Sequence, residues 1–109
     1  MRVAAVISDL MLYSRIESAC SAAGATLDRM DSPGGLADDH DIILVDWSAR
    51  RPEWADALTA WRARTPQPRL ILFGQHTDLE AHAAARGAGL APMVARSRLL
   101  SMLPQLLSA

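Results

Sequence analysis

The chain has 109 residues, half of them hydrophobic, and a formal net charge of −1 at pH 7. This length predicts a single domain over residues 1–109, because it is enough for one hydrophobic core and too short for two. The balanced charge and the ordinary hydrophobic content argue against a disordered chain and against a polyanion as the partner.

One cysteine, Cys20, excludes an internal disulfide and a multi-cysteine metal site, which favours a cytoplasmic location. Its helical spacing from Ile16 predicts that it is a small core residue. The apolar run 3–7 is interrupted at once by polar residues, so we do not interpret it as a signal peptide. No segment is long enough to predict a membrane span.

Five short apolar runs alternate with helical patterns. The runs 3–7, 42–45, 70–73 and 93–95 are continuous, as expected for parallel strands that are covered on both faces. The run 25–30 alternates apolar with charged residues, which is typical of an edge strand half open to water. The first strand is therefore expected inside the sheet, with the second strand beside it.

Helix signals follow each strand. Leu12 and Ile16 begin the apolar stripe of a first helix that should end at Gly24. The segment 31–40 leaves room for only one or two helical turns. A third helix is expected over 52–66, with Trp54, Leu58 and Trp61 on one stripe that forms either core or a partner surface.

The end signals of the last two helices are also specific. Thr77 is expected to cap the fourth helix, which should end near Gly87 or Gly89. Ser97 is expected to cap the last helix, and Pro104 should kink or divide it.

The alternation predicts an α/β fold of three layers, with a five-stranded parallel sheet in the order 2-1-3-4-5, helices on both faces and a short second helix. Ligands of such sheets bind at the carboxyl ends of the strands, where the strand order reverses. Asp9 follows the first strand and Asp46 ends the third, so we expect both acids in one crevice. Such a pair suits a divalent cation or a reactive aspartate.

Simpler roles are open for the same acids. Asp46 would be a loop acid if it pairs with Arg50, Arg51 or Arg96, and Asp9 would be only a cap of the first helix.

The arrangement resembles the receiver domain of bacterial response regulators over essentially the whole chain. The stretch "IILVDWS" matches the phosphoacceptor motif and places Asp46 at the phosphoaccepting position. The stretch "VISDLMLYSRI" has Ser8 and Asp9 where the family has two acids. "LILFGQ" has Gly74 where the family has Thr or Ser.

The end of the fifth strand departs from the family as well. "MVARS" places Arg96 and Ser97 where receivers have Lys and Pro, and Met93 lies where they often carry a switching aromatic residue. An arginine at position 96 is always protonated and can pair bidentately with Asp46.

The resemblance implies a flavodoxin-like fold and a degenerate receiver, or pseudo-receiver, of two-component signalling. In this interpretation the chain is a protein-interaction module, not an enzyme, and phosphorylation of Asp46 is impaired or absent. A kinase or an output protein is the implied partner. No cofactor is required, and Mg²⁺ would bind only weakly at Asp9 and Asp46, because Ser8 replaces one acid.

Two alternatives stay open. One is a phosphoaccepting receiver that uses Asp46 and Mg²⁺ in a phosphorelay. The other is a flavodoxin-like protein that binds a small molecule, although the turn after the first strand has no glycine for a phosphate-cradling loop.

Other sites are weaker. The pair Arg50 and Arg51 is too small a basic cluster to predict nucleic-acid binding. The histidines and acids of the segment 76–82 are interpreted as a solvated helix start and not as a metal site.

The last segment is unusually rich in leucine. Its apolar residues exceed what one sheet face can cover, which predicts a homodimer interface on the face made by the last two helices and the fifth strand. We assign that interface to Leu99, Leu100, Leu103 and Leu107. The alternative is that the kink at Pro104 lets the whole segment fold onto the sheet.

Overall fold

A computed structural model describes residues 1–64, 68–90 and 92–108. It contains a five-stranded parallel sheet in the order β2-β1-β3-β4-β5. The strands are β1 (Arg2–Val6), β2 (Thr26–Met30), β3 (Ile42–Asp46), β4 (Arg69–Gly74) and β5 (Val94–Ala95). The predicted α/β fold and the predicted strand order are confirmed.

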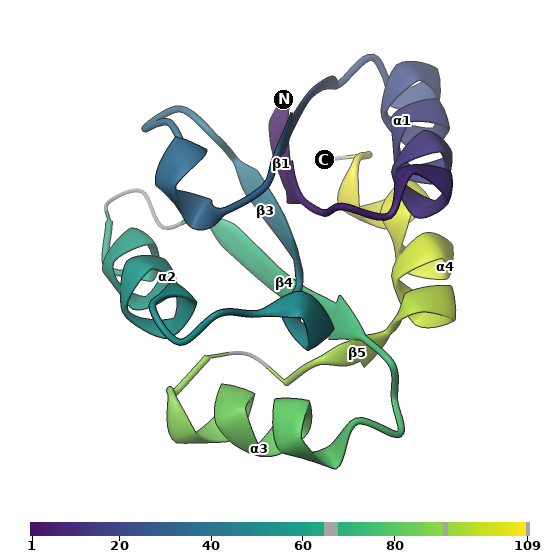
Figure 1. Cartoon of the computed structure of the whole chain (residues 1–109). Coiled ribbons are helices and arrows are strands. Elements are labelled where there is room, and N and C mark those ends of the chain that lie inside the picture. Colours follow the sequence, from purple (N-terminus) through teal and green to yellow (C-terminus); the bar gives the residue numbers. More distant parts are fainter. Residues whose placement is uncertain (65–67, 91, 109) are drawn as a thin grey trace.

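Helices cover both faces of this sheet. They are α1 (Leu10–Ala23), α2 (Trp54–Arg62), α3 (Leu79–Gly87) and α4 (Arg96–Leu106). Figure 1 shows α1 and α4 on one face and α2 and α3 on the other. The short connection after β2 holds only one 3₁₀ turn, η1 (Pro33–Gly35), as its length predicted. Within the described ranges, no helix is long and apolar enough to cross a membrane.

The core forms on both sides of the central strands. All five residues of β3 are buried, and so are Val3 to Val6 of β1. Between α1, α4 and the sheet lie Ile16, Leu44 and Leu99, each fully buried. The continuous apolar runs are therefore strands covered on both faces, as the sequence predicted. Each fully buried aliphatic side chain stabilises the folded state by about 1.5–3 kcal/mol. Cys20 is buried at 1% exposure, which confirms it as a core residue.

Both ends of α1 and the end of α3 at Gly87 agree with expectation, whereas the starts of α3 and α4 differ. Gly24 follows α1 with φ of 71°, the left-handed conformation that favours glycine. The cap of α3 is Asp78 and not Thr77, because the Asp78 carboxylate accepts a hydrogen bond of 3.0 Å from the Ala81 amide. The expected end of the third helix at 65–66 lies outside the described residues.

The last helix corrects two further predictions. Helix α4 begins one residue before Ser97, and its cap position, Ala95, makes no side-chain hydrogen bond. Pro104 does not divide the helix, which continues to Leu106. Because Leu99 and Leu103 are anchored in the core on the turns before the proline, packing keeps this segment helical.

Three of the four leucines assigned to the predicted dimer interface are buried within the single chain. Leu99, Leu103 and Leu107 are 0%, 1% and 6% exposed in the single chain. Their spacing of four places them on one helix stripe, and that stripe faces α1 and the sheet. Leu100 is only partly buried and packs at the edge of the same cluster. Self-association stays a prediction, without these three leucines as its surface.

A polar network closes the opposite, amino-terminal end of the sheet. The His40 side chain is 1% exposed; its Nδ1 accepts the Ala37 amide at 2.9 Å, and its Nε2 lies 2.8 Å from the Asp28 carboxylate. Because Nδ1 accepts, the neutral ring carries its proton on Nε2 and donates it to Asp28. Arg2 joins the network through a bond of 2.8 Å to the same carboxylate and a contact with Asp39. The bonds from His40 and Arg2 lower the pKa of Asp28.

We predict that His40→Ala lowers the free energy of unfolding by about 2 kcal/mol or more, because it leaves the Ala37 amide without a partner and opens a void. The control is His82→Ala, whose partly exposed ring makes a hydrogen bond with the His76 carbonyl. This control should change stability by less than about 0.5 kcal/mol. Urea unfolding measures both, and equal effects for the two variants would contradict the assigned role of His40.

Candidate functional site

The carboxyl ends of β1 and β3 meet at one edge of the sheet. Val6 pairs with Val45 across these parallel strands, so the residues that follow them emerge side by side. Asp46 is the last residue of β3 and is 3% exposed. Asp9 is the cap residue immediately before α1. The strand order therefore delivers both acids to the same edge, as the sequence predicted.

Arg96 bridges the two carboxylates. Its two terminal nitrogens lie 3.4 Å from Asp9 Oδ2 and 3.3 Å from Asp46 Oδ2. Arg96 does not pair bidentately with Asp46, because the guanidinium divides its donors between the cap residue of α1 and the last residue of β3. Both distances exceed the 2.7–2.9 Å of strong charge-assisted hydrogen bonds. Arg96 therefore acts mainly through its charge, as a shared counter-ion.

Asp46 is a buried acid with incomplete partners. Its buried Oδ1 has no hydrogen-bond partner among residues 1–64, 68–90 and 92–108. Burial raises the pKa of Asp46, while the positive charge of Arg96 and the nearby amides of Ser48 and Ala49 oppose this rise. Desolvation is the larger effect, so the charged form of Asp46 is disfavoured relative to an aspartate in water.

Asp9 has a second, structural role. Its Oδ1 accepts the amides of Met11 and Leu12 at 3.0 and 3.2 Å, which caps α1. The other oxygen, Oδ2, is the one that faces Arg96. The interpretation of Asp9 as a helix cap is confirmed, and the same carboxylate also belongs to the crevice.

A polar pocket of about 400 Å³ lies beside Asp46. Its lining includes Ser8, Asp31, Arg51 and Trp54. Asp31 is an acid of this pocket that the sequence analysis did not identify. The available signal was its place directly after the strand predicted to flank the first strand, which puts it at the same edge of the sheet.

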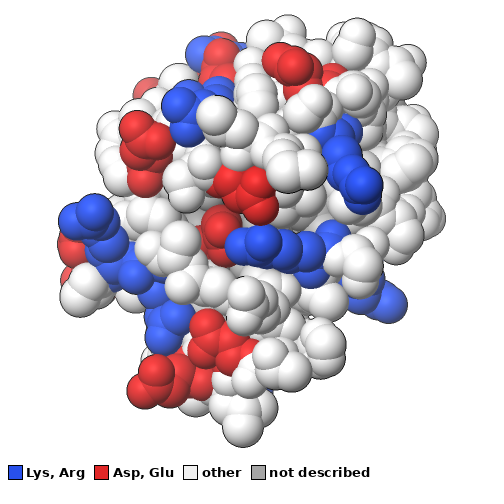
Figure 2. Space-filling view, turned by 45° about the vertical axis from the view of Figure 1, so that its right-hand side comes forward, with Lys and Arg blue, Asp and Glu red and all other residues white. Residues whose placement is uncertain are grey.

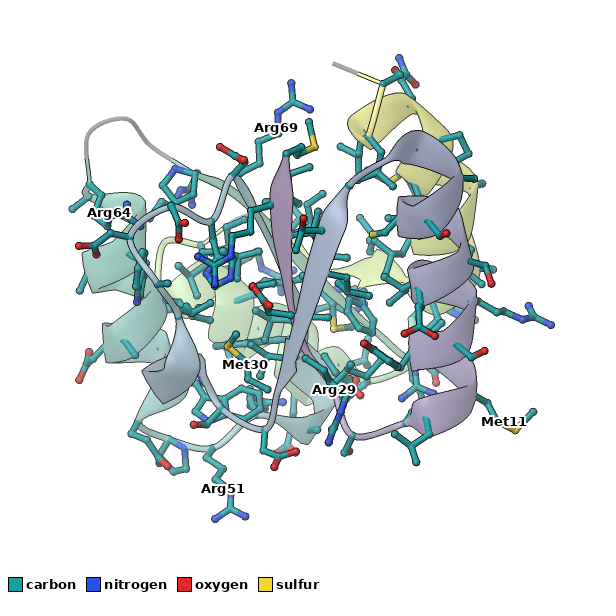
Figure 3. All side chains as sticks on the ribbon, turned by 90° about the horizontal axis from the view of Figure 1, so that it is seen from above. Met11, Arg29, Met30, Arg51, Arg64 and Arg69 are labelled. Atoms are coloured by element: carbon teal, nitrogen blue, oxygen red, sulfur yellow. The ribbon has the colours of Figure 1, made fainter. Side chains whose placement is uncertain are left out.

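Arg29 accompanies Asp31 at this edge. It donates to Asp31 at 3.2 Å and to the Ile7 carbonyl at 3.0 Å. Figure 3 shows Arg29 and Arg51 at one end of the molecule, with Arg64 and Arg69 at the other. Arg29 therefore neutralises part of the charge that Asp31 brings to the pocket.

The carboxylates of Asp9, Asp46 and Asp31 do not fit a magnesium site, because each of them is paired with an arginine. Mg²⁺ prefers an octahedral set of oxygen ligands that includes free carboxylates. Here Arg96 engages Asp9 and Asp46, and Arg29 engages Asp31. In the part of the chain that the structure describes, no three acidic, histidine or cysteine side chains are grouped to hold a metal ion.

Gly74 and Met93, which the resemblance places at the switch positions of receivers, lie beside the same edge of the sheet. Gly74 ends β4 and is buried, and Met93 is 5% exposed just before β5. The side chain of Ser48 lies between them, with its Oγ 4.0 Å from the Met93 sulfur. Ser48 is a second residue that the sequence analysis did not identify, since nothing in the local pattern places it against β4.

The remaining candidate residues have structural roles. Arg50 donates to the Trp47 carbonyl at 3.3 Å and stacks on its ring, so it is not the partner of Asp46. Trp54 and Leu58 are buried in the core beneath α2, and Trp61 packs against them. Figure 2 shows acidic and basic side chains interspersed over one face of the molecule, without a large area of one sign.

Comparisons were made with known families, curated proteins and solved structures. No family model matches this chain, and no curated protein matches it. A response regulator from Hahella chejuensis superposes with a TM-score of 0.73 at 14% identity, over 98% of this chain and 92% of that chain. The chain has the receiver fold.

Further receivers superpose over nearly their whole length. A CheY-like receiver domain protein from Methanospirillum hungatei JF-1 gives a TM-score of 0.69 at 18% identity, over 97% of this chain and 92% of that chain. The beryllofluoride-activated receiver domain of nitrogen regulatory protein C gives 0.63 at 22% identity, over 97% and 93%. At these identities the comparison establishes the receiver fold, and the chemistry has to be argued from the residues.

The raised pKa of Asp46 predicts how stability depends on pH. Between the unfolded-state pKa of about 3.9 and the higher folded-state value, the native protein binds more protons than the unfolded chain. Stability therefore falls as pH rises through this window. Asp46→Asn removes this loss, so we expect the variant to be more stable than the wild type at neutral pH and equal to it near about pH 3.

The matched variant is Asp9→Ala, which should lose about 1 kcal/mol at neutral pH because α1 loses its cap. Denaturant unfolding at several pH values measures both variants. An Asp46→Asn protein less stable than the wild type at neutral pH would show that attraction to Arg96 outweighs the burial of the charge.

Proposed function

We propose that this chain is a receiver-type interaction module of two-component signalling that acts without Mg²⁺-dependent phosphorylation of Asp46. The observation that carries the proposal is the Arg96 guanidinium, which lies between Asp9 and Asp46. A fixed cation of the chain itself takes the electrostatic place that a divalent ion needs between these acids.

The charges in the crevice favour this interpretation. An arginine is protonated at every physiological pH, so its positive charge cannot be removed to admit a metal ion. Mg²⁺ binding at Asp46 would have to separate that carboxylate from Arg96 and also recruit ligands to replace the acid missing at Ser8. A carboxylate that is paired with a cation is also a weaker nucleophile towards a phosphodonor.

The residues at the positions that respond to a phosphoryl group in receivers also differ from those of the family. Gly74 has no side chain to bond such a group, and Met93 is a buried thioether rather than an exposed ring. A group on Asp46 would therefore make few contacts that differ between two conformations, and without such differences it cannot shift an equilibrium. The module is proposed to present one surface constantly to a protein partner in the cytoplasm, either a kinase or an output protein.

One observation favours the phosphoaccepting alternative. Asp31 and Ser8 line the same pocket as Asp46, so Asp31 could supply the charge that Ser8 lacks. In this alternative Arg96 swings away when Mg²⁺ binds. The two proposals make opposite predictions for a metal titration.

We expect no saturable change in tryptophan fluorescence when Mg²⁺ is added to the wild type. Trp54 lines the pocket and Trp47 follows Asp46, so binding there would be visible. Arg96→Ala frees both carboxylates and should introduce saturable quenching, which the further change Asp46→Asn should abolish. Saturation of the wild type at sub-millimolar Mg²⁺ would favour the phosphoaccepting receiver.

We also expect that beryllofluoride, a phosphoryl mimic, leaves the amide spectrum of the domain largely unchanged. The reason is that positions 74 and 93 offer no contacts specific to a second state. Two-dimensional NMR with Mg²⁺ present measures this directly. Large amide shifts along β4 and α3 would overturn the proposed function.

A further inference from the structure

The space beside Gly74 is filled by another part of the chain. A Cβ atom built on Gly74 would lie 2.3 Å from Ser48 Oγ and 3.1 Å from Ser48 Cβ. It would also lie 2.9 Å from the Met93 sulfur, which belongs to a long and flexible side chain. Ser48 lies on the 3₁₀ turn η2 (Trp47–Ala49). Rotation of its hydroxyl away from position 74 would break the hydrogen bond that it accepts from the Gln75 amide, and its Cβ would stay in tight contact.

Gly74 is required by space and not by backbone conformation. The glycines with positive φ are Gly24 and Gly89, and Gly74 is not among them. Any L-residue could adopt the backbone of Gly74, which lies in a regular strand. The space for a side chain at position 74 is therefore limited by Ser48 and by Met93, and Met93 is the more adjustable of the two.

The Ser48 hydroxyl also ties two segments together. Its Oγ accepts the backbone amide of Gln75 at 3.2 Å and faces the Met93 sulfur at 4.0 Å. This bond joins the turn directly after Asp46 to the first residue after β4. The amide that begins the β4–α3 loop is thereby held against the crevice.

We propose that Ser48 is a positioning residue that occupies the volume of a side chain at position 74 and fixes the start of the β4–α3 loop. The proposal rests on the proposed function in one respect, since it supplies the reason why the loop next to Asp46 does not move. The proposal predicts mutual steric exclusion: a serine at position 48 leaves no room for a side chain at position 74.

The Ser48 hydroxyl is not free to bond a group in the crevice. The hydroxyl that the β4 end lacks is present on Ser48, but it is directed to the Gln75 amide and the Met93 sulfur. A group attached to Asp46 can bond this hydroxyl only if the Gln75 amide loses its acceptor. Ser48 therefore stabilises one loop position and opposes a second.

A double-mutant cycle tests this mutual steric exclusion. Gly74→Ser in the wild type forces a clash, whereas the same change in a Ser48→Gly background enters the vacated space. We expect Gly74→Ser to raise the unfolding equilibrium constant in the wild type, and to do so about tenfold less in the Ser48→Gly background. The matched control is Gly87→Ser, because a Cβ at Gly87 meets nothing within 4 Å.

Amide hydrogen exchange supplies a second readout that does not require the clashing variant to fold. Ser48→Ala should speed exchange of the Gln75 amide by about tenfold and leave amides of the central strand β3 unchanged. Equal effects of Gly74→Ser in both backgrounds, or an unchanged Gln75 amide in Ser48→Ala, would overturn the proposal. If the Gly74→Ser chain folds only together with Ser48→Gly, the proposal is supported.

The two proposals fail separately. Coupling between positions 48 and 74 is measured without metal or phosphodonor, so it stands or falls on packing alone. A beryllofluoride response of the wild type would remove the proposed function even if the coupling is found.

Discussion

The attraction of one guanidinium for two carboxylates is the interaction on which the crevice depends. Arg96 is the first residue of α4, Asp9 precedes α1 and Asp46 ends β3, so this contact joins three segments that are distant in sequence. Because Asp46 is buried on an inner strand, its charge needs a neighbouring cation. The chain contains 11 arginines and no lysine, and the cation at this place is one that never loses its proton.

Hydrogen bonds on both sides of this contact hold the neighbouring segments in one conformation. Asp9 is held in place by its bonds to the start of α1, and Ser48 holds the start of the β4–α3 loop on the other side. The acids that would otherwise attract a metal ion are each engaged by an arginine. In the function that we propose, the receiver fold is kept and these internal contacts replace phosphorylation of Asp46.

The fold could be predicted because its signals are local. Continuous apolar runs such as 42–45 indicate strands covered on both faces, and Gly24 marks the end of a helix in any context. Helix starts were less certain, since Thr77 and Asp78 are adjacent and both are suitable caps. The abundance of leucine in α4 predicts more exposed apolar surface than the structure has, because Leu99, Leu103 and Leu107 all lie on one buried stripe. Ser48 and Asp31 act through tertiary neighbours, which no local pattern reveals.

The most direct test of the account is the titration of the Asp46 carboxyl carbon by NMR in the wild type and in Arg96→Gln. Burial raises the pKa of Asp46, and the charge of Arg96 opposes that rise. The account predicts a midpoint above that of an ordinary aspartate in the wild type, a still higher midpoint in Arg96→Gln, and no effect of Mg²⁺ on the wild-type midpoint. An identical midpoint in the two proteins, or a wild-type midpoint lowered by Mg²⁺, would contradict the assignment of Arg96 as the counter-ion of the crevice.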